Sequence, residues 1–206
     1  YNQLIARRIR EFGVYTEIIP FNTPIAEIKK HNPTGIILSG GPSSVFGEEA
    51  ALVDRELFEM GVPVLGICYG MQLISHLLGG EVKKGVKGEY GKSDLTVLAQ
   101  NSLFNGVPEK STVWMSHFDE VMKAPEGFVV SGKSNIDIAA MANESRNIFA
   151  VQFHPEVTHS EFGSKMLENF VFNICKADKN WVLKDFIETE IQRIKEVVGD
   201  KKVILG

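Results

Sequence analysis

The sequence has few of the features that mark secreted, membrane or nucleic-acid-binding proteins. It contains 2 cysteines in 206 residues, which argues against a disulfide framework and favours a reduced, cytoplasmic setting. No apolar run reaches the roughly 20 residues that cross a bilayer, and the first residues lack the apolar core of a secretory signal. The net charge of -4 argues against a broad nucleic-acid-binding surface, although a small local anion site is compatible with it. The sequence shows no cysteine and histidine cluster with the spacing of a zinc site.

Apolar, β-prone runs and helical patterns alternate through the first third of the chain. Strands that are apolar on both faces and separated by helices are typical of a parallel sheet that is covered on both sides. The patterns predict helices over residues 1–12, 25–30, 48–60 and 70–78, and strands over residues 14–19, 35–39 and 62–67.

The middle of the chain has a different character. Its runs are short and strand-like, with turn residues between them, over residues 95–98, 112–115, 128–131, 138–142 and 148–153. These runs predict antiparallel strands added to the edge of the sheet. Helical patterns follow over residues 161–175 and 182–198. The sequence therefore predicts an α/β fold with a mostly parallel, doubly wound sheet and an added set of antiparallel strands.

Cys68 stands between an apolar run and a helical pattern. The segment from Gly66 to Gly70 reads Gly-x-Cys-x-Gly, the cysteine form of the nucleophile elbow. A sharp turn from strand to helix strains the backbone at the cysteine and requires small residues two positions to either side. The turn places Cys68 at a helix N-terminus, where backbone N–H groups and the helix dipole stabilise a thiolate. We predict that Cys68 is a catalytic nucleophile and that Cys175, which ends an apolar run, is structural.

A nucleophilic cysteine requires a base, and the base requires a group that orients it. His154 follows an apolar run and opens His154-Pro155-Glu156. Pro155 pushes His154 into an extended conformation, so the side chains of His154 and Glu156 point the same way. Taken alone, this tripeptide is more often a polar turn that closes a strand. Its place at a strand end, like that of Cys68, favours a catalytic base and its orienting carboxylate.

A third segment, from Ser39 to Pro42, also follows an apolar run and contains two consecutive glycines. Glycines let backbone N–H groups approach a ligand closely, as an oxyanion hole requires. We predict donors near Gly41 and at Tyr69, next to the nucleophile. A plain turn and a phosphate loop are the alternatives, and the absence of a following Gly-Lys-Ser/Thr counts against a nucleotide P-loop.

These segments resemble those of class I glutamine amidotransferases in their order and spacing, and the resemblance covers nearly the whole chain. The matching segments are residues 39–42, 66–72 and 153–156. The resemblance implies that Gln72 helps to bind glutamine. It also implies that the segment of Ser116, His117 and Phe118 holds the amino-acid end of this substrate. Phe118 stands where the family usually has a small residue. No metal or cofactor is implied for the glutaminase step.

Within this family the sequence is most similar to the GMP synthase group. The supporting segments are residues 41–45, 89–91, 114–117 and 154–160. This similarity implies that the released ammonia converts XMP to GMP, with ATP and Mg²⁺, in a separate ATP-pyrophosphatase domain of a homodimeric enzyme. Residues 1–178 are expected to form the amidotransferase domain without its first strand. Residues 179–206 are expected to form a connecting helix and the first strand of the pyrophosphatase domain. Gly88 stands where that group commonly has an arginine.

Two other functions fit part of the pattern. A cysteine peptidase or related thiol hydrolase would use the same elbow and histidine, but the full set of segments favours glutamine. A binding or regulatory module with an inactive site is the second alternative. The presence of Cys68, His154 and Glu156 together counts against it.

Overall fold

The computed structural model describes residues 1–42, 44–47, 50–85, 88–135, 138–199 and 201. Within these residues the helices are α1 (Asn2–Glu11), α2 (Ile25–Lys30), η1 (Arg55–Glu59), α3 (Tyr69–Leu78), η2 (Glu144–Arg146), α4 (Gly163–Glu168), η3 (Asn169–Ile174) and α5 (Leu183–Val198). The strands are β1 (Ile36–Leu38), β2 (Val64–Ile67), β3 (Glu81–Lys83), β4 (Glu89–Val97), β5 (Lys110–His117), β6 (Glu120–Lys123), β7 (Val129–Lys133), β8 (Ala140–Asn143) and β9 (Ile148–Val151).

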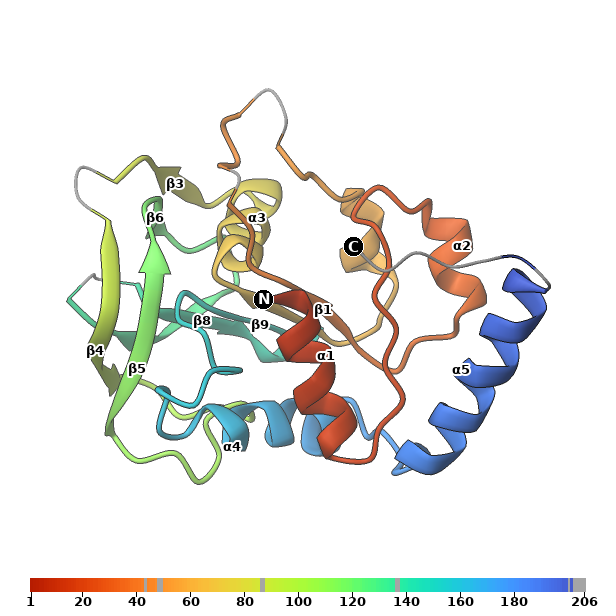
Figure 1. The fold of residues 1–206 in the computed structure, drawn as a ribbon. Helices are drawn as coiled ribbons and strands as arrows, with labels where there is room; N and C mark the ends of the chain where they lie inside the picture. Colours follow the sequence, from red (N-terminus) through yellow and green to blue (C-terminus); the bar gives the residue numbers. More distant parts are fainter. Residues whose placement is uncertain (43, 48–49, 86–87, 136–137, 200, 202–206) are drawn as a thin grey trace.

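A seven-stranded sheet forms the centre of the described molecule (Figure 1). Its strand order is β1-β2-β9-β8-β7-β4-β5. Strands β1, β2 and β9 are parallel, whereas β8, β7, β4 and β5 continue the sheet with antiparallel pairs. A separate antiparallel pair, β3 with β6, lies beside α3. The predicted α/β fold, with a parallel part and added antiparallel strands, is confirmed.

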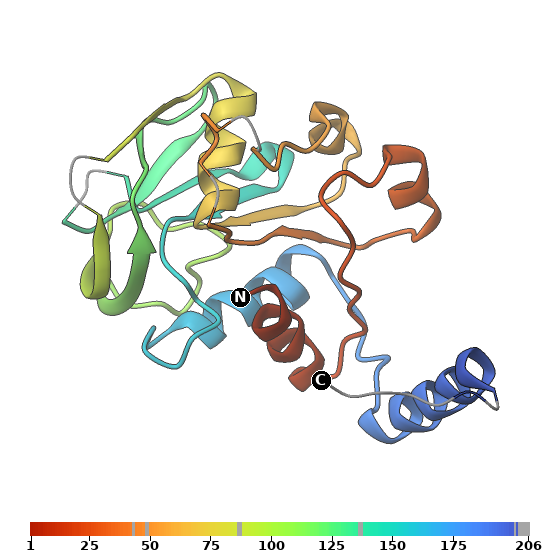
Figure 2. The same cartoon turned by 45° about the horizontal axis from the view of Figure 1, so that its top comes forward.

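The parallel part is covered by helices on both faces (Figures 1 and 2). Apolar side chains of α1, α4 and η3 pack on one face, where they meet Leu65 and Ile67 of β2. Side chains of α2, η1 and α3 pack on the other face against Val64 of the same strand. All four residues of β2 and of β9 are buried. This two-sided burial explains why these runs are apolar throughout rather than alternating.

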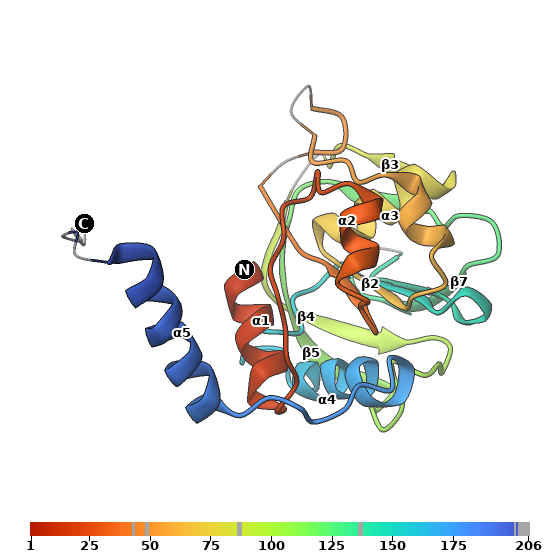
Figure 3. The same cartoon turned by 90° about the vertical axis from the view of Figure 1, so that its right-hand side faces the viewer.

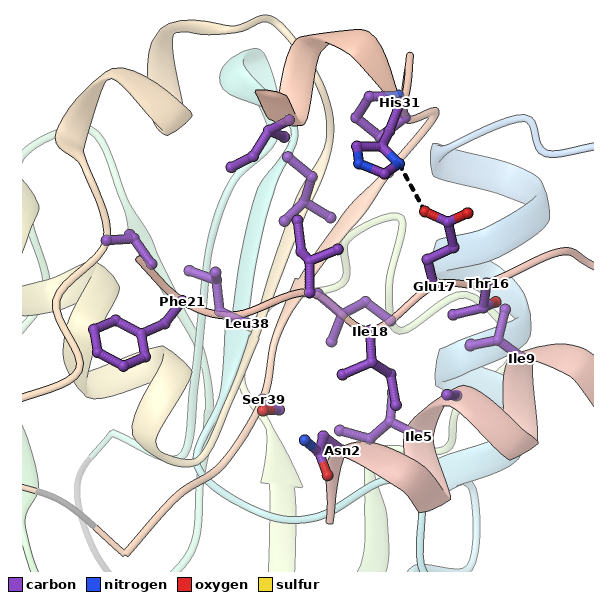
Figure 4. Close-up of a pocket in the computed structure, with 18 of the residues that line it drawn as sticks. Asn2, Ile5, Ile9, Thr16, Glu17, Ile18, Phe21, His31, Leu38 and Ser39 are labelled. Carbon is purple, nitrogen blue, oxygen red and sulfur yellow. Dashed lines mark ion pairs between the residues drawn. The ribbon is translucent and has the colours of Figure 1, made fainter. Parts of the chain in front are cut away.

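The strand predicted over residues 14–19 does not form. This segment runs without a strand partner, and β1 is the last strand on that side of the described sheet. A cavity of about 590 Å³ lies between this segment, α1 and β1 (Figure 4). Its wall includes apolar side chains such as Ile5, Ile9 and Ile18. A β-strand is stabilised by its contacts with a neighbouring strand, so the β-prone composition of residues 14–19 is not enough by itself to form one.

Other boundaries differ in smaller ways. Of the helix predicted over residues 48–60, the structure shows η1 alone, and the Asp54 side chain caps it by accepting from the Glu56 N–H at 2.9 Å. Residues 161–175 form α4 followed by the π-helix η3. The predicted strand over residues 201–205 lies almost wholly outside the described residues. None of the described helices is both long and apolar enough to span a bilayer.

Candidate active site

Cys68 occupies a strained turn between β2 and α3. Its backbone angles are φ 54° and ψ -106°, a region that non-glycine residues rarely adopt. The turn is packed too tightly for side chains at its flanking glycines: a methyl group on Gly66 would lie 2.6 Å from the Gly70 carbonyl oxygen, and one on Gly70 would overlap the Leu38 carbonyl. The nucleophile elbow predicted from the Gly-x-Cys-x-Gly spacing is therefore present.

The parallel pairing of β2 with β9 brings Cys68 and His154 to the same end of the sheet. The Cys68 N–H donates to the Val151 carbonyl at 2.8 Å, so the elbow is hydrogen-bonded to the end of β9. Three residues beyond that end, the His154 N–H donates to the Trp114 carbonyl of β5 at 2.9 Å. The Ser160 hydroxyl donates to the His154 carbonyl at 2.7 Å. The backbone on both sides of the imidazole is thus fixed.

His154 and Glu156 form a buried pair. Nδ1 of His154 lies 2.7 Å from Oε1 of Glu156, and the two residues are 2% and 1% exposed. Burial opposes a charged ring, but hydrogen bonding to Cys68 and Glu156 outweighs it and raises the pKa of His154 to about 9. Nε2 is buried, and the thiol of Cys68 is the second side chain that interacts with the ring. The ring is therefore oriented by Glu156 and has its other nitrogen available toward Cys68.

The two cysteines lie in contrasting surroundings. Cys68 faces polar groups, and its Sγ lies 3.5 Å from the Ser116 carbonyl oxygen. Burial raises the pKa of the Cys175 thiol to about 12, and its Sγ fills the space where a side chain at Gly35 would lie. The thiol of Cys175 is therefore poorly disposed to ionise and packs as an apolar group.

The glycine loop after β1 lies against the elbow and the imidazole. A methyl group on Gly40 would lie 3.1 Å from Cε1 of His154 and 3.3 Å from Cβ of Cys68. Gly41 follows in the same loop, and Tyr69 begins α3 directly after the nucleophile. The two backbone segments that were predicted to donate to an oxyanion thus both lie next to Cys68.

The predicted glutamine-binding residues surround Cys68 in different ways. Ser116 presents its backbone carbonyl to the thiol, whereas the His117 ring is buried against the Asp119 carbonyl and the Glu89 carboxylate. Any contact that His117 makes with a substrate would therefore come from its backbone. Phe118 is 48% exposed. Gln72 is buried on α3, and its Nε2 donates to the Asp119 carbonyl at 2.8 Å.

Three further residues near the site were not singled out from the sequence. Nε of Arg8, on α1, donates to the Glu156 carbonyl at 3.0 Å, across 148 positions of sequence. The Tyr1 ring lies 4.7 Å from the His154 ring, centroid to centroid. The buried Asp119 carboxylate accepts from the Ser44 hydroxyl at 2.5 Å. Local sequence patterns do not predict contacts between such distant segments. An aspartate is rarely buried without a role, so Asp119, which follows the predicted substrate segment, was a candidate that the sequence offered.

The large cavity beside β1 reaches the glycine loop and the start of α3 but not the thiol, imidazole or carboxylate of this site. Among the described residues its lining includes Gly40, Gly41 and Tyr69 but not Cys68, His154 or Glu156. The described residues also contain no group of three or more His, Cys, Asp or Glu side chains placed to hold a metal ion. The chemistry of the site is that of a thiol, an imidazole and a carboxylate.

The family model for class-I glutamine amidotransferases matches residues 1–174. The chain belongs to this family, as its elbow and its buried histidine–glutamate pair lead one to expect. Two curated relatives are bacterial enzymes named GMP synthase (glutamine-hydrolysing). The one from Aquifex aeolicus is 53% identical over 99% of this chain, and the one from Lactobacillus gasseri is 55% identical over 100% of this chain. The chain spans about 40% of the length of each relative.

Solved structures agree with this assignment. A crystal structure attributed to a GMP synthase subunit of Thermoplasma acidophilum has a TM-score of 0.79 and 32% sequence identity, over 94% of this chain and 92% of that one. A glutamine amidotransferase from Thermotoga maritima has a TM-score of 0.54 and 22% identity, over 84% of this chain and 74% of that one. At that identity the second likeness supports the fold alone.

Proposed function

We propose that this chain hydrolyses glutamine to glutamate and ammonia through a thioester on Cys68. The observation that carries the proposal is the meeting of Cys68, in a strained elbow, with the buried pair of His154 and Glu156. Membership of the class-I glutamine amidotransferase family supports glutamine, rather than a peptide, as the substrate.

The first half of the reaction forms the thioester. The Cys68 thiolate attacks the side-chain amide carbon of glutamine, and the carbonyl oxygen becomes an oxyanion. Backbone N–H groups near Gly41 and at Tyr69 would stabilise that charge. His154, whose pKa is raised to about 9, carries the proton that the departing amine needs to leave as ammonia.

The second half of the reaction releases glutamate. Neutral His154 takes a proton from water as the water attacks the thioester carbon. Collapse of the second tetrahedral species breaks the C–S bond and returns the thiol, with the proton restored from the imidazole. Glu156 keeps the ring oriented and stabilises its charged form in both halves.

Similarity to GMP synthases supports a role for the ammonia. We propose that it converts XMP to GMP in an ATP-pyrophosphatase domain that uses ATP and Mg²⁺. We place the protein in the cytoplasm, since both cysteines are free and disulfides are typical of oxidising compartments. The full-length enzyme is proposed to be a homodimer.

We further propose that residues 1–178 form the amidotransferase domain and that residues 179–206 lead to the synthetase domain. Helix α5 projects away from the rest of the molecule (Figure 3), and Ile191, Ile194 and Val197 are exposed on it. The cavity between residues 14–21 and β1 would hold one more strand of the sheet, preceding Tyr1 in the whole protein. Such a strand would pair with β1 and cover the apolar wall.

Glutamate release from three forms of the protein tests these proposals. The forms are the chain as given, the chain preceded by the first strand, and the full-length protein supplied with XMP, ATP and Mg²⁺. We expect the first form to release little glutamate and the second form to recover folding. We expect the third form to release glutamate well above the rate of the second. The coupling proposal is wrong if the chain as given already matches the loaded full-length protein. The glutaminase proposal is wrong if the loaded protein releases no glutamate.

A further inference from the structure

Four polar side chains gather beside the carboxyl end of β5, those of Glu89, Ser93, His117 and Asn135. Glu89 of β4 lies at their centre. Its Oε1 accepts from the Ser93 hydroxyl at 2.7 Å and from Nδ2 of Asn135 at 3.2 Å. Its Oε2 lies 3.3 Å from Nε2 of His117. The Glu89 carboxylate therefore joins β4, β5 and the turn after β7.

Both ring nitrogens of His117 face oxygen atoms. Nδ1 lies 3.0 Å from the Asp119 carbonyl, and since a carbonyl only accepts, Nδ1 carries a hydrogen. Nε2 faces the Glu89 carboxylate at 3.3 Å. The His117 side chain is 1% exposed and that of Glu89 is 16% exposed. A polar pair held this far from water is costly to break, because the remaining partner stays buried without its hydrogen bond.

This pair fixes the segment that passes Cys68. His117 is the last residue of β5, and Ser116, one position earlier, has its carbonyl oxygen 3.5 Å from Sγ of Cys68. The His117 ring also holds the Asp119 carbonyl, which Gln72 contacts as well. The backbone from Ser116 to Asp119 is thus anchored by one ring, and Glu89 orients that ring.

We propose that Glu89 is a positioning residue for glutamine binding, which it serves through His117. The inference rests on the proposed glutaminase function and adds to it a determinant of substrate affinity. Glu89 itself does not touch Cys68. It holds the Ser116–Asp119 backbone in the geometry that receives the amino-acid end of glutamine, so its loss raises KM more than it lowers kcat.

The test uses the full-length protein that contains this chain, supplied with XMP, ATP and Mg²⁺. Glu89→Gln keeps the size of the side chain and removes its charge, and His117→Gln removes the ring. Each is expected to raise KM for glutamine about 10- to 100-fold, as the loss of a hydrogen bond to a charged group does. The double variant is expected to be no worse than the more severe single variant, because the two residues act as one unit. Glu109→Gln, an exposed glutamate just before the other end of β5, is the matched control and should leave KM unchanged.

Alkylation of Cys68 by iodoacetamide separates positioning from a general loss of structure. Its rate should stay within about twofold in Glu89→Gln, because the elbow and its helix N-terminus are untouched. Asn135→Ala removes a single donor to Glu89 and serves if Glu89→Gln folds poorly; it should raise KM in the same direction by a smaller factor. An unchanged KM in Glu89→Gln, additive losses in the double variant, or a parallel fall in alkylation rate would each overturn the proposal. Absence of glutamate release by the unaltered protein would overturn the glutaminase function itself.

Discussion

The two sides of β2 differ in how completely they are partnered. On one side β9 pairs with all four residues of β2, and both strands are buried along their full length. On the other side the three residues of β1 follow, and beyond them lie the cavity and residues 14–21, which form no strand. The proposed catalytic groups belong to the first side, since Cys68 directly follows β2 and His154 follows β9.

The proposed catalytic geometry therefore depends on a different part of the sheet from the part that is incompletely packed. The geometry of Cys68, His154 and Glu156 depends on the β2–β9 pair and on β5, all of which are packed and hydrogen-bonded. The β1 side leaves apolar side chains such as Ile18 and Ile19 40% exposed. The candidate site is therefore preorganised even though one flank of its sheet buries less apolar surface.

The largest expected effects lie within the catalytic side. His154→Ala removes the group that transfers protons, which is typically worth ~10²- to 10⁴-fold in rate. Glu156→Gln keeps a hydrogen-bonding side chain beside the ring and is expected to lower glutamine hydrolysis less. Steady-state rates of glutamate release by the two variants decide the order. A greater loss from the Glu156 change would show that the assigned roles are reversed.

Matched isoleucines compare the stability of the two sides. Ile148, in β9, is 1% exposed, whereas Ile18 is 40% exposed beside the cavity. Ile148→Ala is expected to lower the free energy of unfolding by about 2–5 kcal/mol, as deletions in close-packed cores do. Ile18→Ala is expected to cost less than about 1 kcal/mol. Urea titration measures both, and equal losses would contradict the contrast drawn between the two sides.

The buried pair also predicts how stability depends on pH. Despite burial, hydrogen bonding to Cys68 and Glu156 raises the pKa of His154 from 6.5 to about 9, so these contacts stabilise the folded state fully below pH 6.5 and lose this contribution as pH rises through about 9. A shift of this size corresponds to on the order of 3 kcal/mol. The difference in unfolding free energy between the unaltered protein and His154→Gln should therefore shrink between pH 6.5 and about pH 10. A difference that grows over this range would contradict the assignment.

Two neighbouring arginines on α1 give the smallest expected effect. Arg7 and Arg8 both pair with Glu11 at 3.0 Å, but Arg8 alone of the two is also seen to reach the Glu156 carbonyl. Arg8→Ala should lower glutamine hydrolysis several-fold, since a single lost hydrogen bond is worth about 1 kcal/mol. Arg7→Ala should leave the rate unchanged. Similar rates for the two variants would remove α1 from the positioning of Glu156.

Features fixed by neighbouring residues could be predicted from the sequence. Small residues at Gly66 and Gly70 permit the turn at Cys68, and Pro155 sets the relation of His154 to Glu156. The strand over residues 14–19 could not be predicted correctly, because a strand also needs a partner beside it. The contact of Arg8 with Glu156 and that of Glu89 with His117 join segments that only the folded sheet brings together.

The sequence also contained the signal for the buried position of the His117 side chain, which was not predicted. Successive residues of a strand face opposite sides of the sheet, so Ser116 and His117 could not both direct side chains at one substrate. The helix over residues 48–60 failed for another local reason, because Asp54 caps a short helix that begins only at Arg55. Apolar content alone does not show where a helix begins.

Labelling with a glutamine-analogue electrophile, followed by peptide mapping, tests the central claim most directly. Cys68 lies in the elbow beside His154, whereas burial raises the pKa of Cys175 to about 12. We predict that the reagent labels Cys68 stoichiometrically in the full-length protein, that glutamine protects it, and that Cys175 stays unlabelled. Equal labelling of Cys175, or no protection by glutamine, would contradict the assignment of Cys68 as the nucleophile of a glutaminase site.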